Sequence, residues 1–245
     1  MKKSSAFLLA LLITLAVALN VYLFNSSAPE QRTKVIITET IDGDTLASEN
    51  ERFRLANINT PEKSEQGYEE AKDFLAQLNN QTVEVEILGA DRYGRTLVRI
   101  YAPDYINLKI VEQGLGKKFL VEESEAKEFA EAERAAVENN RGMWKRSQYF
   151  GCFEIFLEQS PEYLHIKNNC PQINLWDWVV TDESRKRYKF PSIVVGEVNL
   201  HTGNGKNNST DVFWNQAQNV WNNDRDTVYL FDSNGKIALH HDYNY

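Results

Sequence analysis

The stretch that decides the fold of this chain consists of four short segments, Ile41-Asp42-Gly43-Asp44-Thr45, Phe53-Arg54-Leu55, Asn59-Thr60-Pro61-Glu62 and Asp91-Arg92-Tyr93-Gly94-Arg95. They place carboxylates and arginines within, or at the ends of, segments rich in β-forming residues. Arginine forks and a divalent cation can neutralise a phosphate that gains charge in its transition state, and a carboxylate can activate the attacking water. The combination therefore points to cleavage of a phosphodiester bond.

The four segments occur in the order that is typical of the staphylococcal-type nuclease (thermonuclease) family, and residues 33–145 resemble that family. One Asp-Gly-Asp alone would indicate only a turn, so the resemblance depends on all four segments together. It implies an OB-type five-stranded barrel with three helices. It also implies calcium-dependent hydrolysis of DNA and RNA.

The resemblance implies a metal site made by three residues. Asp44 matches an aspartate that binds the metal in the family, and the backbone carbonyl of Thr60 matches a second ligand. The third ligand is an aspartate in the family, whereas this chain has Asn59. The affinity for calcium depends on the number of charged oxygen ligands. We therefore expect weaker binding of Ca²⁺ here, with another divalent cation as an alternative cofactor.

The same resemblance assigns three catalytic residues. Arg54 and Arg95 match the two arginines that bind the phosphate and its transition state, and Glu62 matches the general base. An arginine suits this role because its planar, permanently charged fork makes bidentate contacts. Each residue alone could be structural, as a surface arginine or as a glutamate favoured near a helix N-terminus. Their joint occurrence favours the catalytic interpretation.

The chain is acidic, with a formal net charge of −8. Residues 33–147 contain 16 Lys and Arg against 22 Asp and Glu, a balance of −6. Proteins that bind nucleic acid tightly and without sequence preference are usually basic, so this balance argues against such a binder. Arg54, Arg92, Arg95 and Arg99 still predict a local basic groove.

The N-terminus begins with Met1-Lys2-Lys3 and continues with an apolar run from Phe7 to Phe24. Lysines ahead of an apolar run are typical of export signals, and the run is also long enough to span a bilayer as a helix. Residues 1–28 are therefore predicted to be a signal peptide or an uncleaved membrane anchor. Either alternative places the rest of the chain outside the cytoplasm.

Residues 29–147 form the predicted barrel domain. Its strands are expected at residues 34–40, 45–48, 52–58, 82–87 and 95–101, and its helices at residues 64–78, 106–112 and 123–139. We expect Trp144, after the last helix, to pack on the barrel. Phe119 could stack on a base, or it could belong to the core.

Residues 148–245 show short alternating runs and turn residues without a helical period, which favours a β-sandwich. Tyr163–Asn168, Leu175–Asp182 and Asp226–Asp232 resemble strands of the lamin-tail domain, which implies an immunoglobulin-like sandwich with an unknown partner. Strands are expected at residues 153–157, 163–168, 173–180, 187–190, 193–197, 227–231 and 237–240.

The two cysteines of the chain, Cys152 and Cys170, both lie in this second domain. An even number in an exported chain fits one disulfide, and the alternative is two buried free thiols. The tryptophans of the domain are expected in its core or at its edge, or else in an exposed cluster that binds a partner or glycan. They are Trp176, Trp178, Trp214 and Trp221.

The sequence thus predicts a mostly β chain that works as an exported, metal-dependent nuclease on DNA and RNA, with an appended domain that binds or tethers it. The alternative is a non-catalytic OB module at the cell surface that binds single-stranded nucleic acid or a protein partner. A third interpretation makes the lamin-tail-like domain a surface adhesion module with a nuclease attached.

Overall fold

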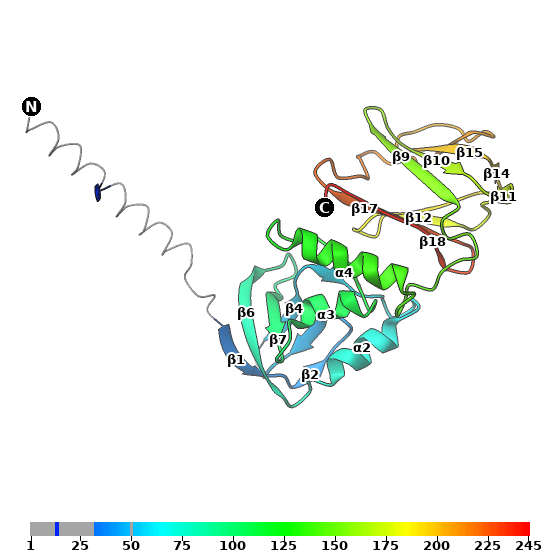
Figure 1. Ribbon diagram of the computed structural model, residues 1–245. Helices are drawn as coiled ribbons and strands as arrows, with labels where there is room; N and C mark the ends of the chain where they lie inside the picture. The colour runs from blue at the N-terminus through cyan, green and yellow to red at the C-terminus, as the bar shows by residue number, and fades with distance from the viewer. Residues whose placement is uncertain (1–12, 15–31, 50) are drawn as a thin grey trace, which may run out of the picture. The chain divides into compact units, whose positions relative to one another are not determined.

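The computed structural model describes residues 13–14, 32–49 and 51–245 of the chain (Figure 1). The chain separates into two compact units, residues 1–33 and 34–245, and the second contains nearly all of both predicted globular domains. The predicted N-terminal apolar helix lies outside the described residues, apart from Ile13 and Thr14. Among the described residues, no helix is long and apolar enough to cross a membrane.

Six strands of the described chain form the main sheet of the first domain in the order β1-β6-β7-β4-β3-β2. The strands are β1 (Arg32–Ile36), β2 (Glu39–Thr40), β3 (Thr45–Ala47), β4 (Arg52–Leu55), β6 (Thr82–Ala90) and β7 (Thr96–Tyr101). β6 and β7 run antiparallel, whereas β4 and β7 run parallel. The short strands β5 (Ile58–Asn59) and β8 (Lys117–Lys118) pair separately. This arrangement confirms the predicted OB-type barrel.

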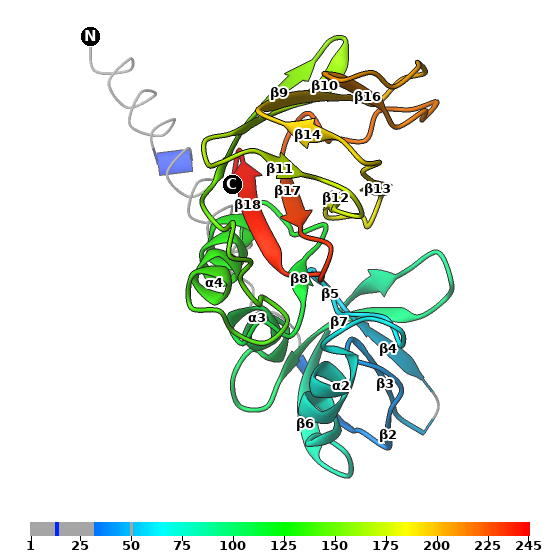
Figure 2. The ribbon, with the colours of Figure 1, turned by 90° about the vertical axis from the view of Figure 1, so that its right-hand side faces the viewer.

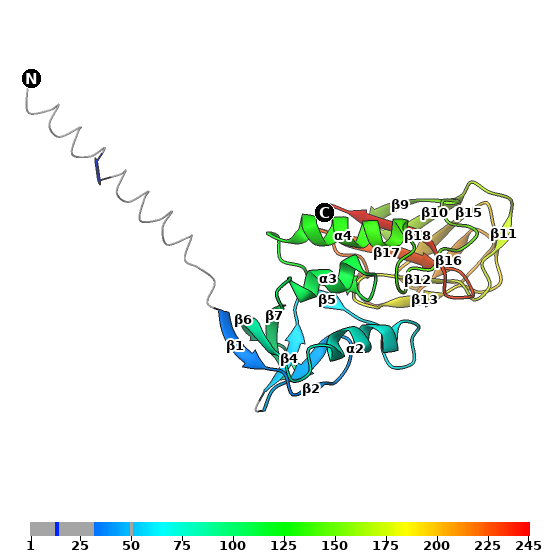
Figure 3. The ribbon, with the colours of Figure 1, turned by 60° about the horizontal axis from the view of Figure 1, so that its bottom comes forward.

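The described part of this domain has three helices, α2 (Tyr68–Ala76), α3 (Ile106–Glu112) and α4 (Ala126–Glu138). α3 and α4 pack side by side (Figures 1 and 3). The start predicted for α2 at residue 64 is wrong, because the chain turns between Glu62 and Gly67 first. Gly67 has a φ of 93°, which favours glycine, and the helix begins after it. Glu62 therefore lies in a turn rather than at a helix end.

The second domain is a sandwich, in which β9, β10 and β16 lie on one side and β12, β17 and β18 on the other (Figure 2). Its sheets have the orders β16-β15-β10-β9 and β13-β12-β17-β18, with a small β11-β14 pair. The strands are β9 (Phe153–Gln159), β10 (Glu162–Asn168), β11 (Ile173–Asn174), β12 (Val179–Thr181), β13 (Arg187–Lys189), β14 (Val194–Val195), β15 (Glu197–His201), β16 (Asp211–Phe213), β17 (Asp226–Phe231) and β18 (Ile237–Tyr243). The predicted immunoglobulin-like sandwich is thus confirmed.

The sequence prediction does not include β16. It also merges β11 with β12 into one strand, because the turn at Leu175–Trp178 between them is itself rich in apolar residues. A disulfide joins Cys152 to Cys170, as predicted. The tryptophans Trp178, Trp214 and Trp221 are buried in the core, whereas Trp176 is 61% exposed. The core interpretation therefore holds for three of these four tryptophans.

Trp144 corrects another expectation, because it packs against the second domain rather than on the barrel. Its buried ring stacks on Tyr229 of β17, with the ring centroids 5.5 Å apart, and on Phe231 at 6.4 Å. Together with Ala136 and Val137 of α4 these rings form a separate apolar cluster. The two domains therefore share a packed interface.

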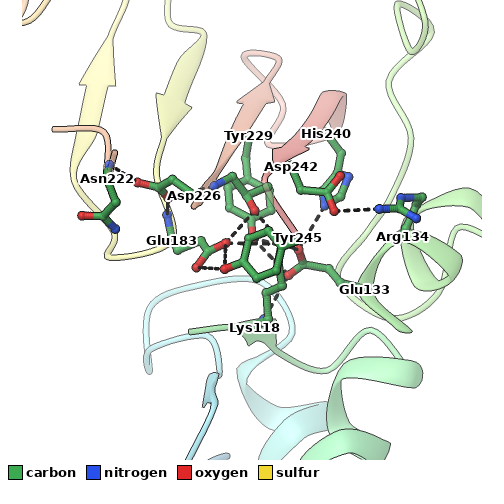
Figure 4. A network of polar contacts seen from close by, with 11 residues as sticks. Lys118, Glu133, Arg134, Glu183, Asn222, Asp226, Tyr229, His240, Asp242 and Tyr245 are labelled. Atoms are coloured by element: carbon green, nitrogen blue, oxygen red, sulfur yellow. Dashed lines mark hydrogen bonds and ion pairs between the residues drawn. The ribbon is translucent and has the colours of Figure 1, made fainter. Parts of the chain in front are cut away.

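A buried polar network adjoins this cluster (Figure 4). Nζ of Lys118, in β8, lies 2.6 Å from a carboxylate oxygen of Glu133 in α4 and 3.3 Å from Glu183 of the second domain. The hydroxyl of Tyr229 donates to Glu133, and that of Tyr245 donates to Glu183. A charge buried without partners is costly, so these contacts hold β8, α4 and the second domain in one arrangement.

Candidate active site

The acidic turn between β2 and β3 is the first component of the site. The carboxylate of Asp44 is buried and accepts hydrogen bonds from the amide of Thr60 and the hydroxyl of Thr45, each at 3.1 Å. Gly43 permits this approach, because a Cβ there would lie only 2.6 Å from Oγ1 of Thr60. The amide of Asp44 in turn donates to Asp42 at 3.1 Å.

Arg54 extends from β4 into the same place. Its Nη2 lies 3.1 Å from Oδ2 of Asp44, and it donates to Oδ1 of Asn59 at 2.6 Å and to the carbonyl of Ile58 at 2.7 Å. Burial lowers the pKa of Arg54, against the opposing attraction of Asp44. The side-chain oxygen of Asn59 is thus directed at a guanidinium in this arrangement.

Arg95 approaches from the turn before β7. Its Nε lies 2.7 Å from Oδ2 of Asp91, and its Nη1 donates to the hydroxyl of Thr45 at 3.3 Å. Its side chain is 29% exposed, compared with 10% for Arg54. Arg95 is therefore the arginine of the two that a ligand in solution reaches more easily.

Glu62 and Thr60 lie beside the acidic turn, and a residue of the second domain reaches both. Nη1 of Arg185 pairs with Oε1 of Glu62, while its Nη2 donates to the backbone carbonyl of Thr60. The side chain of Glu62 nevertheless remains 67% exposed. It is therefore accessible to water.

A single cleft of about 1420 Å³ brings most of the predicted site together. Asp44, Arg54, Asn59, Glu62 and Arg95 all line this cleft, and Thr60 lines a neighbouring pocket of about 420 Å³. Residues from four separate segments of the sequence are thus gathered at one surface of the barrel.

The oxygen atoms around the acidic turn are the candidate ligands for a hard divalent cation. Within the described residues, no group of three or more His, Cys, Asp and Glu could hold a metal ion. The oxygens of Asp42, Asp44 and the Thr60 carbonyl are nevertheless of the kind that calcium prefers. Burial and the nearby charge of Asp44 raise the pKa of Asp42, so a cation would relieve an unfavourable pair of carboxylates. These oxygen donors fit calcium, but they include fewer carboxylates than a high-affinity calcium site offers.

Sequence reasoning missed two residues of the site. Asp42 lies two residues before Asp44, and that spacing is the signal that could have identified it. Arg185 lies more than 120 residues from Glu62 in the sequence, and no local motif connects the two. The only signal was the basic run Arg185-Lys186-Arg187 in an otherwise acidic chain.

The barrel with three helices and a cleft lined by arginines and carboxylates defines a nuclease-type domain. Residues 52–146 match the family model described as "Staphylococcal nuclease homologue", and residues 152–245 match "Lamin Tail Domain". The chain belongs to the staphylococcal nuclease family, and a lamin tail domain follows its nuclease domain.

Three relatives illustrate the similarity of the nuclease part. An "Uncharacterized endonuclease" of Escherichia coli O157:H7 is 30% identical over 114 residues, which are 44% of this chain and 74% of that protein. An "Uncharacterized endonuclease" of Haemophilus influenzae is 30% identical over 139 residues, or 54% and 78% of the two chains. A "Micrococcal nuclease" of Shigella flexneri is 30% identical over 125 residues, or 44% and 71%.

Proposed function

We propose that the protein is an exported, metal-dependent nuclease that hydrolyses phosphodiester bonds of DNA and RNA. The observation that carries this proposal is the gathering of Asp44, Arg54, Glu62 and Arg95 at one cleft. An exposed carboxylate, two arginines and a buried carboxylate are the groups that this hydrolysis requires.

The proposed roles follow from where each side chain lies. Arg95, which is partly exposed, and Arg54, which is held by Asp44, donate to phosphate oxygens whose charge grows as the reaction proceeds. Glu62 takes a proton from the attacking water, whose oxygen bonds to phosphorus while the bond to the leaving ester oxygen breaks. The leaving oxygen takes a proton from solvent water and departs as an alcohol, and both arginines stay charged throughout.

Calcium is the proposed cofactor, and another divalent cation is the alternative because Asn59 brings no charge. Asp42, Asp44 and the carbonyl of Thr60 would hold the ion, and when bound it supplies positive charge beside the phosphate. Asn59 keeps Arg54 in place through its 2.6 Å hydrogen bond.

We further propose that the protein acts outside the cytoplasm and that the lamin tail domain binds an unknown partner that tethers it. Lysines before the apolar N-terminal run support export, either with cleavage of the segment or as a membrane anchor. The disulfide between Cys152 and Cys170 also supports export, because disulfides persist in oxidising compartments. Cell fractionation measures this location. If the chain is found in the cytoplasm with both thiols reduced, the proposed export is contradicted.

The decisive experiment measures cleavage of DNA and RNA with calcium, with other divalent cations and with a chelator. Arg95→Ala and Arg54→Ala should each lower turnover by a factor of about 100 to 1,000, as expected for losing one donor to transition-state charge. Arg134→Ala is the matched control, because Arg134 pairs with Asp242 away from the cleft. It should turn over like the unmodified protein.

Two results would refute this function. Full cleavage in chelator would exclude the metal-dependent reaction. No cleavage with any divalent cation, in protein that melts cooperatively, would favour the alternative, an OB module that binds single strands or a protein at the cell surface.

A further inference from the structure

The basic residues of the second domain are concentrated in one place. Residues 148–245 contain 8 Lys and Arg against 12 Asp and Glu, a balance of −4. Half of those basic residues lie within Arg185–Lys189. Each of these four side chains forms an ion pair with a carboxylate, and Arg185 is the one whose partner is the proposed general base, Glu62.

The structure places the start of this run at the nuclease cleft. Ser184, Arg185 and Lys186, from the turn between β12 and β13, line the same cleft as Arg54 and Arg95. The Arg185 side chain is 30% exposed. The second domain therefore supplies part of the wall of the cleft.

The turn that carries Arg185 is held firmly. Asp182 accepts from the amide of Lys186 at 2.7 Å and from the hydroxyl of Ser184 at 2.5 Å. The next residue, Glu183, belongs to the buried network with Lys118 and Tyr245 (Figure 4). A group fixed in this way loses little conformational freedom when it binds a ligand.

We propose that Arg185 binds the phosphodiester backbone of the nucleic acid substrate beside the scissile bond, so that the lamin tail domain completes the nuclease cleft. The present partners of its guanidinium are Glu62 and the Thr60 carbonyl, which are the proposed base and a proposed metal ligand. Arg185 lines the cleft, and its guanidinium would keep its charge if water and a cation replaced it at these two oxygens. A phosphate oxygen pair is its natural complement.

A purely structural role must be separated from this one, and the chain offers a matched control. Arg225 makes the same kind of bridge from the second domain, pairing with Glu123 and donating to the carbonyl of Val121. Unlike Arg185, it does not line the cleft. Substituting either arginine removes one bridge between the domains, but only Arg185→Ala removes a charge from the cleft.

The test uses the full 245-residue chain and a fluorescein-labelled oligothymidylate, with binding followed by fluorescence anisotropy in chelator at several salt concentrations. Arg185→Ala should weaken binding about tenfold, or about 1.4 kcal/mol. Each contact to a single-stranded phosphate contributes about 0.7 to the slope of log affinity against log salt, so the slope should fall by about that amount. Arg185→Lys should lie between, and Arg225→Ala should bind like the unmodified chain.

The KM for cleavage with calcium should rise by a similar factor in Arg185→Ala, with kcat within about twofold, because the contact is made in ground and transition state alike. If Arg185→Ala and Arg225→Ala bind the oligonucleotide equally well, Arg185 is only a bridge and the inference is overturned. It is also overturned if Arg185→Ala lowers the calcium concentration needed for activity without weakening binding of the oligonucleotide. Arg185 would then act only by occupying Glu62 and the Thr60 carbonyl in competition with the ion.

This inference rests on the proposed function, yet the two can fail separately. A chain that binds the oligonucleotide through Arg185 but never cleaves it would refute the nuclease while supporting the binding role. A chain that cleaves normally and whose affinity is unaffected by Arg185→Ala would refute the inference alone.

Discussion

Replacing Lys118 by methionine should destabilise the protein strongly, because it would remove the cation that two buried carboxylates, those of Glu133 and Glu183, share. The Lys118 side chain is 0% exposed, as is that of Glu133, and Glu183 is 6% exposed. Burial works to raise the pKa of Glu133, but Lys118 and His240 outweigh it and lower that pKa to about 2. Removing one partner of a buried ion pair typically costs about 3–5 kcal/mol in the free energy of unfolding. For a folded unit of this size, such a loss lowers the Tm by about 10 °C.

Differential scanning calorimetry on the full chain measures this effect, and Lys127→Met is its control. Lys127 also pairs with a glutamate, but Nζ lies 3.8 Å from Glu131 and the two side chains are 85% and 59% exposed. An exposed pair of this kind contributes about 0.5 kcal/mol or less. If Lys118→Met melts within about 2 °C of the Lys127→Met protein, less than 1 kcal/mol by the same scaling, the network is not desolvated and the reasoning fails.

Three further predictions concern other parts of the chain. Burial and the charge of Glu183 raise the pKa of Asp226 to about 7, so the folded state keeps a proton that the unfolded chain releases near pH 3.8. The free energy of unfolding should therefore fall as the pH rises from 3.8 to about 7. Asp226→Asn should flatten a plot of Tm against pH over this range, and an unchanged slope would contradict the prediction. Asn59→Asp adds a carboxylate beside Arg54 and should lower the calcium concentration that gives half-maximal cleavage. If that concentration does not change, position 59 does not influence the binding of the ion. Replacing Cys152 and Cys170 by alanine opens a loop of 18 residues and should cost about 3 kcal/mol in urea unfolding, and a midpoint equal to that of the parent would argue against this.

The sequence by itself was sufficient for the two folds, because its motifs resemble two known families and local patterns mark most of the strands and helices. The alternation at Thr82–Ile87 produced β6, and Ile106–Glu112 was predicted with the bounds that α3 has. The turn at Asp232-Ser233-Asn234-Gly235 connects β17 to β18, with Gly235 at a φ of 74°. Errors arose where apolar residues lie in turns or where a strand is very short, since periodicity needs several residues to be visible.

The sequence also indicated the composition of the candidate site, because its residues lie in motifs whose order can be read directly. Asp44, Arg54, Glu62 and Arg95 reach one cleft only through the pairing of β3 with β4 and of β4 with β7. Their mutual distances, and the use of the Asn59 side chain to hold Arg54, could not be read from spacing along the chain.

What only the tertiary structure decided is how the two domains combine. Trp144 has no local signal that directs it to Tyr229 rather than to the barrel, and Lys118 reads as an ordinary surface lysine. Arg185 meets Glu62 across a separation of 123 residues. Contacts of this kind depend on the docking of complementary surfaces that are complete only after each domain has folded. A one-dimensional pattern records the periodicity within an element, but it carries no record of which finished surfaces will meet.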